Sequence, residues 1–173
     1  VLAFWRDLFA CLALVAALRL RGRGRLRWQP EQLRFFAVYG LILSLFNALW
    51  TVSVTLNGAA ISTVLAYSSG GFTAILAWWL FRERLGWGKL AAVALSLGGC
   101  VLVSGALDLS SWQANPLGIV TGLLAGVGFA GYSLMGKESA RRGIDPWAAL
   151  TYTFGIAAAF LLVEGQVLGL LQG

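Results

Sequence analysis

The chain has 173 residues, of which 59% are hydrophobic and only 12% are charged. Soluble domains carry roughly a quarter charged residues, and so few charges could not cover this much apolar surface in water. The same composition excludes a disordered chain, a collagen-like fibre and a small disulfide-stapled module. The sequence therefore predicts an integral membrane protein of the all-α class, a polytopic bundle of transmembrane helices.

Histidine is absent from the sequence. This absence excludes Ser-His and Cys-His catalytic pairs, HExxH zinc sites and histidine-ligated haem. The two cysteines, Cys11 and Cys100, stand alone in apolar stretches and suit packing positions. We expect no enzyme activity, no catalytic residue, no metal and no cofactor.

Six apolar segments approach the length of about 20 residues that an α-helix needs to cross a bilayer. Glycine, proline and asparagine, which interrupt helices, lie between them. The predicted crossings run from Leu2 to Leu18, Phe35 to Leu56, Ala59 to Phe81, Leu90 to Leu107, Leu117 to Met135 and Trp147 to Leu171.

Positive charges mark alternate loops of this arrangement. Twelve of the 13 Lys and Arg residues lie in the loops 19–34, 82–89 and 137–145. The positive-inside rule places these loops in the cytoplasm and both ends of the chain outside. We expect a multi-pass protein of the inner (plasma) membrane that contacts the lipid bilayer and, despite its net charge of +6, no nucleic acid. Because the first residue is Val1 and no signal peptide precedes an outside start, we expect a fragment of a longer protein.

The second predicted helix carries Ser44, Asn47, Thr51 and Thr55 at intervals of three and four residues, which places them on one helical face. Asn47 is the most costly of these residues to bury, because its amide needs hydrogen-bond partners. Two interpretations stay open. The face lines a substrate cavity, or its side chains bond to neighbouring helices and to their own backbone.

The third and fifth predicted helices contain glycine patterns. Gly70 and Gly71 follow Tyr67 and Ser69 near the middle of the third helix, where they favour either a local break or close packing. In the fifth helix, glycine at positions 118, 122 and 126 predicts tight helix packing. Trp50 and Tyr132 are candidates to line a cavity for an apolar or aromatic part of a substrate.

Few ionisable residues lie at membrane depth. Glu164, in the outer half of the sixth predicted helix, is a candidate for coupling to protons, although its side chain is also close enough to reach the interface. Glu83 stands between Arg82 and Arg84 at the cytoplasmic end of the third helix, where we expect a structural ion pair.

The stretch from Ala59 to Gly105 resembles the EamA-type domain of the drug/metabolite transporter superfamily. The similarity lies in small and hydroxyl residues that lead to Tyr67, an aromatic residue at Phe72, the run FRERL with Glu83 at the family's acidic position, and a glycine-rich helix that ends GGCVLVSG. The segment from Trp5 to Gly22 resembles the family's second helix, and NPLGIVTGLLAGVGFAGYSLMGK resembles the helix that opens the second repeat. The proline that many members have at Gly70 or Gly71 is missing.

This resemblance implies ten helices in two inverted five-helix repeats, of which the chain holds helices two to seven. Residues 1–107 are then the latter four helices of the first repeat, 108–116 an extracytoplasmic loop, and 117–173 the first two helices of a truncated second repeat. The implied function is secondary transport of small metabolites, such as amino acids or related compounds, by alternating access. A membrane scaffold or accessory subunit is the alternative, an intramembrane enzyme is less favoured, and homodimer formation stays open. Together with the polar face, the resemblance makes these residues the cavity candidates: Ser44, Asn47, Trp50, Thr51, Tyr67, Ser69, Gly70 and Tyr132.

Overall fold

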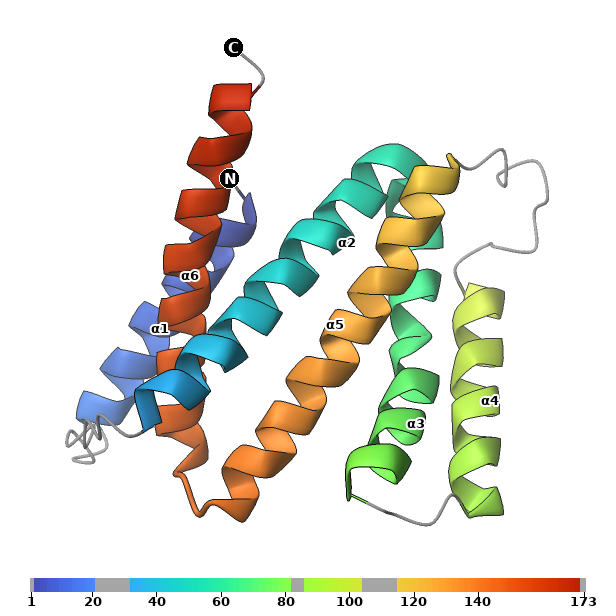
Figure 1. The fold of residues 1–173 in the computed structure, drawn as a ribbon, viewed down its shortest axis with the longest axis horizontal. Helices are drawn as coiled ribbons and strands as arrows, with labels where there is room; N and C mark the ends of the chain where they lie inside the picture. Colours follow the sequence, from blue (N-terminus) through green and yellow to red (C-terminus); the bar gives the residue numbers. More distant parts are fainter. Residues whose placement is uncertain (1, 21–31, 82–85, 104–114, 172–173) are drawn as a thin grey trace. The chain divides into compact units, whose positions relative to one another are not determined.

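The computed structural model describes residues 2–20, 32–81, 86–103 and 115–171 (Figure 1). The regular structure of these ranges is helical throughout, which agrees with the predicted all-α class. The helices are α1 (Leu2–Leu20), α2 (Leu33–Tyr67), α3 (Ser69–Phe81), α4 (Trp87–Val103), α5 (Pro116–Arg141) and α6 (Pro146–Leu171). Their bounds lie within a few residues of most of the predicted segments.

α2 is a hairpin of two helical limbs that meet at Gly58. This glycine has φ 78° and ψ 165°, a backbone conformation that side chains other than glycine's disfavour. Ser53 Oγ lies 2.8 Å from Ser62 Oγ, which is hydrogen-bond distance. Nine residues of continuous helix would separate these positions by about 13.5 Å, so the chain must reverse between them. The reversal coincides with the turn that the sequence predicts between its second and third crossings.

A second interruption, at Ser68, separates α2 from α3. The amide of Ser68 donates to Leu65 O at 3.1 Å, and the amide of Gly71 donates to Ser68 O at 3.0 Å. These bonds reach back three residues, as in a tight 3₁₀ turn, instead of the four residues of an α-helix. Of the two interpretations of Gly70 and Gly71, the structure therefore contains the local break, two residues before Gly70.

In the described part of the chain, three helical stretches are long and apolar enough to cross a membrane: Leu33–Leu80, Pro116–Arg141 and Pro146–Glu164. The first has 48 residues, which make about 72 Å of helix against a hydrocarbon thickness of about 30 Å. It also contains the reversal at Gly58. These stretches define a multi-pass helical membrane protein, and six crossings stay a prediction.

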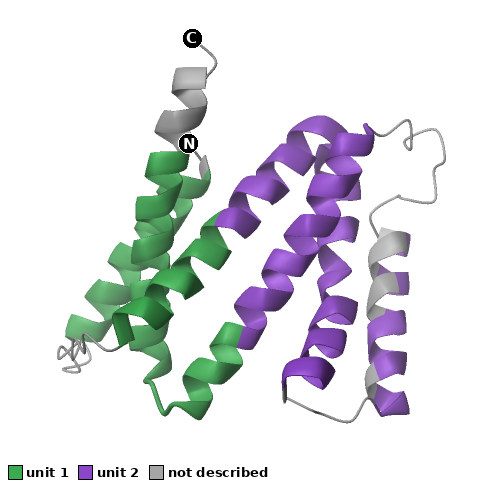
Figure 2. Ribbon diagram, viewed as in Figure 1, with its two compact units in different colours: residues 1–44, 135–173 green, residues 45–134 purple. Residues whose placement is uncertain are grey.

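Contacts divide the chain into two compact units, which Figure 2 shows in different colours. Unit 1 comprises residues 1–44 and 135–173, and unit 2 comprises residues 45–134. Helices α2 and α5 each contribute one end to unit 1 and the other end to unit 2. The units therefore differ from the predicted repeat segments 1–107 and 117–173, a division that stays a prediction.

The glycine repeat of α5 holds unit 2 together by close approach. A Cβ atom at Gly122 would lie 2.8 Å from Ser53 Oγ and 2.8 Å from Leu65 Cδ1. A Cβ atom at Gly126 would lie 2.8 Å from Ser68 Oγ. These distances are too short for real side-chain contacts, so α5 packs against both limbs of the α2 hairpin only because these residues are glycine. The predicted role of the repeat in tight packing is confirmed.

Unit 1 is built around α6. Helix α1 packs along it, and Cys11 Sγ lies 3.5 Å from the carbonyl oxygen of Thr151. The first turns of α2 pack on the same helix, because a Cβ atom at Gly40 would lie 2.6 Å from Ile156 Cγ2. Ala157 and Ala158 of α6 are buried at 0% and 3% exposure. Small residues therefore let three helices approach closely in this unit.

Candidate functional site

Unit 2 contains a cavity of about 230 Å³ beside the helix break at Ser68. This volume is smaller than that of most ligand pockets, which are typically about 300–1,000 Å³. The first limb of α2, its second limb, α3 and α5 all contribute side chains to the wall. The lining residues are Phe46, Trp50, Thr63, Ala66, Tyr67, Ser69 and Phe129.

Aromatic rings make most of the cavity wall. The rings of Phe46 and Phe129 lie 5.2 Å apart at 60°, a separation and angle typical of favourable ring pairs. α5 approaches Phe46 closely here because residue 128 is a glycine. A Cβ atom at Gly128 would lie only 3.3 Å from Phe46 Cβ. The ring of Tyr67 is 52% exposed. The aromatic wall therefore suits an apolar or planar group of a bound molecule.

Hydroxyl groups provide the polar part of the same wall. Ser69 is buried at 5% exposure, and Thr63 Oγ1 donates to Ala59 O at 2.6 Å. None of the described residues that line the cavity is charged. Because an unpaired charge is costly to bury, the part of a solute that enters this cavity should be uncharged.

The cavity brings together three of the eight predicted site residues, namely Trp50, Tyr67 and Ser69. Two others lie near it without lining it. The ring of Tyr132 is 6.0 Å from that of Phe129, and Gly70 is exposed.

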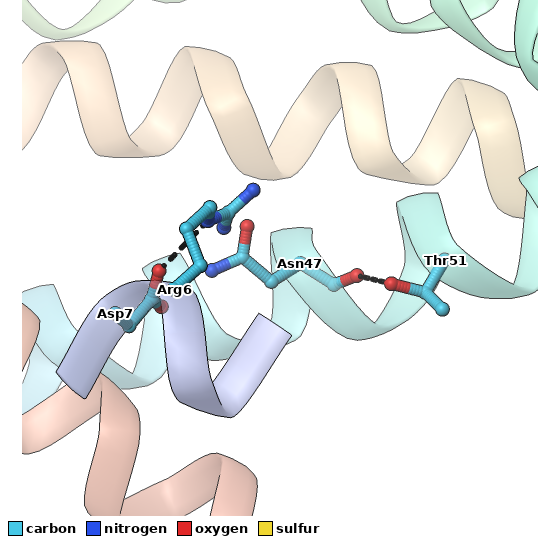
Figure 3. A network of polar contacts seen from close by, with 4 residues as sticks. All are labelled: Arg6, Asp7, Asn47 and Thr51. Atoms are coloured by element: carbon cyan, nitrogen blue, oxygen red, sulfur yellow. Dashed lines mark hydrogen bonds and ion pairs between the residues drawn. The ribbon is translucent and has the colours of Figure 1, made fainter. Parts of the chain in front are cut away.

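The polar face of the second predicted helix does not form one continuous wall. Ser44 and Asn47 are buried at 0% and 1% exposure, whereas Thr51 and Thr55 are exposed. Thr51 Oγ1 donates to Asn47 O at 2.7 Å (Figure 3), and Thr55 Oγ1 donates to Val52 O at 2.8 Å. The threonine hydroxyls thus satisfy the backbone of their own helix, as the packing interpretation expects.

Four lining residues, Phe46, Thr63, Ala66 and Phe129, are absent from the predicted cavity residues. A signal for two of them exists in the sequence. Phe46 precedes Trp50 by four residues and Thr63 precedes Tyr67 by four residues, which places each pair on one helical face. Phe129 has no such signal, because it lies on α5 and its neighbours depend on how that helix packs.

A carboxyl group of unit 1 lies against the end of its α2 segment. The hydroxyl proton of Ser44 has two acceptors within reach, Leu41 O at 3.0 Å and Glu164 Oε1 at 3.3 Å. The second oxygen, Glu164 Oε2, is buried and has no hydrogen-bond partner among the described residues. The structure thus joins two predicted site residues, Ser44 and Glu164, that are 120 positions apart in the sequence.

Asp7 is a second buried carboxyl group, and the sequence prediction omits it. Its side chain is 0% exposed and accepts a hydrogen bond from Arg6 Nε at 3.1 Å. Figure 3 shows this pair on the first turns of α1. The sequence signal for this site is an acidic residue, Asp7, inside an apolar helix. The predicted ion pair of Glu83 with Arg82 and Arg84 lies outside the described residues.

A helical membrane protein with a small aromatic cavity at a helix break has the features of a solute-binding membrane protein. The sequence profile of the EamA-like transporter family matches residues 1–105, which are more than half of the chain. The chain belongs to the EamA-like transporter family, and the predicted resemblance is confirmed.

Two curated relatives have the same general character. The chain is 28% identical over 103 residues to an uncharacterized transporter of Synechocystis sp., which covers 60% of this chain and 31% of that protein. It is 30% identical over 120 residues to the uncharacterized transporter YwfM of Bacillus subtilis, which covers 69% of this chain and 40% of that protein. The chain therefore matches less than half the length of each relative. No solved structure matches the chain significantly.

Proposed function

We propose that the protein containing this chain is a secondary transporter that moves small metabolites across the inner membrane by alternating access. The observation that carries this proposal is the cavity of about 230 Å³ at the break between α2 and α3. Transporters use interrupted helices at solute sites, because a break leaves backbone groups available and lets two helix segments move separately. Membership of the EamA-like transporter family supports the same function.

The cavity wall favours one class of solute. Four aromatic rings offer a surface for an apolar or aromatic group, and the hydroxyls of Ser69 and Tyr67 can orient a polar edge of that group. Amino acids with apolar side chains, and related compounds, meet this requirement through their side chains. Their amino and carboxylate groups would remain outside the cavity, because its described lining offers no charged partner.

The rest of the proposal concerns the whole protein. Two inverted five-helix repeats would form the complete transport path, of which this chain supplies helices two to seven. The basic loops 19–34, 82–89 and 137–145 would face the cytoplasm. A scaffold or accessory subunit would need no cavity, so the cavity favours transport over that alternative, and no part of the proposal requires an enzyme activity.

Counterflow in proteoliposomes tests the solute site directly. The full-length gene product is purified, reconstituted and assayed with a panel of radiolabelled amino acids and related small metabolites. We expect Trp50→Ala to abolish counterflow of the preferred solute, because it removes one of the aromatic walls. Trp79→Ala is the matched control, since Trp79 is 71% exposed and does not line the cavity.

Both variants should elute as monodisperse protein with wild-type yield. Equal counterflow by the two variants would contradict the placement of the solute in this cavity. Wild-type protein that transports none of the panel would contradict the proposed substrate class.

A further inference from the structure

We infer that Glu164 is a proton-binding site, in which Oε2 takes up one proton while Ser44 holds Oε1, and that this proton couples to transport. The coupling part of the inference rests on the proposed function, whereas the proton-binding part does not. The inferred ligand is a proton, the simplest ligand that the geometry of Glu164 and Ser44 can accommodate.

The two oxygens of Glu164 have different surroundings. Oε1 lies 3.3 Å from Ser44 Oγ, whose single proton is shared between this oxygen and Leu41 O at 3.0 Å, but Oε2 is buried and has no partner in the described part of the chain. A buried, ionised carboxylate needs hydrogen bonds or a counter-charge at both oxygens. A proton on Oε2 removes the charge and leaves Oε1 as a carbonyl oxygen that still accepts from Ser44.

Among the described residues, Glu164 has a hydrogen-bond contact with Ser44 and no ion pair. Helix α6 packs against α1 and the start of α2, and α5 contributes its last turns to the same unit. On α1, Arg6 Nε and Asp7 Oδ1 form an ion pair at 3.1 Å. None of the described titratable side chains in the unit is bonded to Glu164; they are Arg6, Asp7, Cys11, Arg19, Arg34, Tyr39, Lys137, Glu138, Arg141, Arg142, Asp145 and Tyr152.

A metal ion does not fit this pair. Hard cations bound by oxygen take about six or more ligands, and Glu164 with Ser44 offers far fewer. The described residues contain no group of three or more His, Cys, Asp or Glu side chains suited to a metal. A proton requires only one lone pair, which the unpartnered Oε2 provides.

The chain connects this site directly to the solute cavity. Ser44 precedes the cavity residue Phe46 by two positions on the first limb of α2. Loss of the proton creates a charge that must gain water or new hydrogen-bond donors, and the partner most directly affected is Ser44. A change in protonation therefore acts on the same helix limb that supplies Phe46 and Trp50 to the cavity.

Infrared difference spectroscopy tests proton binding without any substrate. The full-length gene product, reconstituted in lipid, is titrated with acid while the carboxylic-acid carbonyl region is recorded. We expect a protonated-carboxyl band that disappears in Glu164→Gln and persists in Glu138→Gln, which removes an exposed carboxylate paired with Arg142. In Ser44→Ala the band should move to higher wavenumber, because the carbonyl oxygen Oε1 loses its hydrogen bond. A band that is unchanged in Glu164→Gln would overturn the inference.

Transport in proteoliposomes tests the coupling. Wild-type protein and Glu138→Gln should accumulate solute when a pH gradient is imposed. Glu164→Gln should lose this accumulation while solute counterflow without a gradient stays measurable. Accumulation by Glu164→Gln at the wild-type level would overturn the coupling. If the wild type shows no counterflow at all, the proposed function fails, and the infrared band still decides whether Glu164 binds a proton.

Discussion

Unit 2 surrounds an uncharged cavity with aromatic rings, and its described buried hydroxyls bond largely to backbone carbonyls nearby. Ser53 Oγ, for example, donates to Gly118 O at 2.7 Å and Ser62 Oγ donates to Gly58 O at 2.8 Å. Unit 1, in contrast, buries the carboxyl group of Asp7 and one carboxyl oxygen of Glu164. Under the proposed function, solute binding would belong to unit 2 and the inferred proton binding to unit 1.

The packing of unit 2 is tested at Gly122. We expect Gly122→Leu to destabilise the protein strongly, because a Cβ atom there would lie 2.8 Å from Ser53 Oγ and 3.0 Å from Leu65 Cβ. Overpacking a core typically costs about 1–3 kcal/mol, and here it would also push α5 away from the α2 hairpin. Thermal unfolding followed by fluorescence-detected size exclusion would measure the loss.

The control for this change is Gly98→Leu on α4. A Cβ atom at Gly98 would meet nothing within 4 Å, so we expect wild-type or slightly higher stability, because leucine favours a helix more than glycine does. Similar losses in the two variants would show that the glycine repeat of α5 is not a packing device.

The charged side of the comparison is tested at Asp7. Arg6→Ala should destabilise unit 1 by about 1–3 kcal/mol, because it leaves the fully buried Asp7 carboxylate without its arginine partner. Asp7→Ala should cost less, because the Arg6 side chain that it leaves behind is 53% exposed and water can solvate it. The unfolding midpoints of the two variants in the same detergent give the comparison. A larger loss for Asp7→Ala would mean that interactions of the carboxylate other than the bond from Arg6 stabilise this end of α1.

Local features of the fold could be predicted from the sequence. The reversal at Gly58 and the helix starts at Pro116 and Pro146 follow from residues whose backbone preferences act over one turn. Gly70 and Gly71 likewise indicate the break, although the i→i−3 bond of Ser68 places it two residues earlier. Such signals are local and therefore survive in a single sequence.

The composition of the site could be predicted only in part. Trp50, Tyr67 and Ser69 line the cavity as expected, but Phe129 joins them because α5 packs beside the hairpin. The spacing of Ser44, Asn47, Thr51 and Thr55 defines a helical face without saying which neighbours cover it, and only the first two are buried. Tertiary packing decides such contacts, and helical periodicity carries no information about it.

The smallest effect on stability is expected from substituting two hydroxyl residues of one helix limb, of which one is buried and the other exposed. Ser53→Ala removes the hydrogen bonds to Ser62 Oγ and Gly118 O and should cost about 1 kcal/mol. Thr55→Val, two residues later, removes only an exposed bond to Val52 O and should change the stability by less than about 0.5 kcal/mol. Equal effects in thermal unfolding would mean that the Ser53 hydroxyl does not hold the hairpin against α5. If only Ser53→Ala lowers stability, the buried Ser53 hydroxyl acts as a bond between helix segments of unit 2, whereas the exposed Thr55 hydroxyl contributes little.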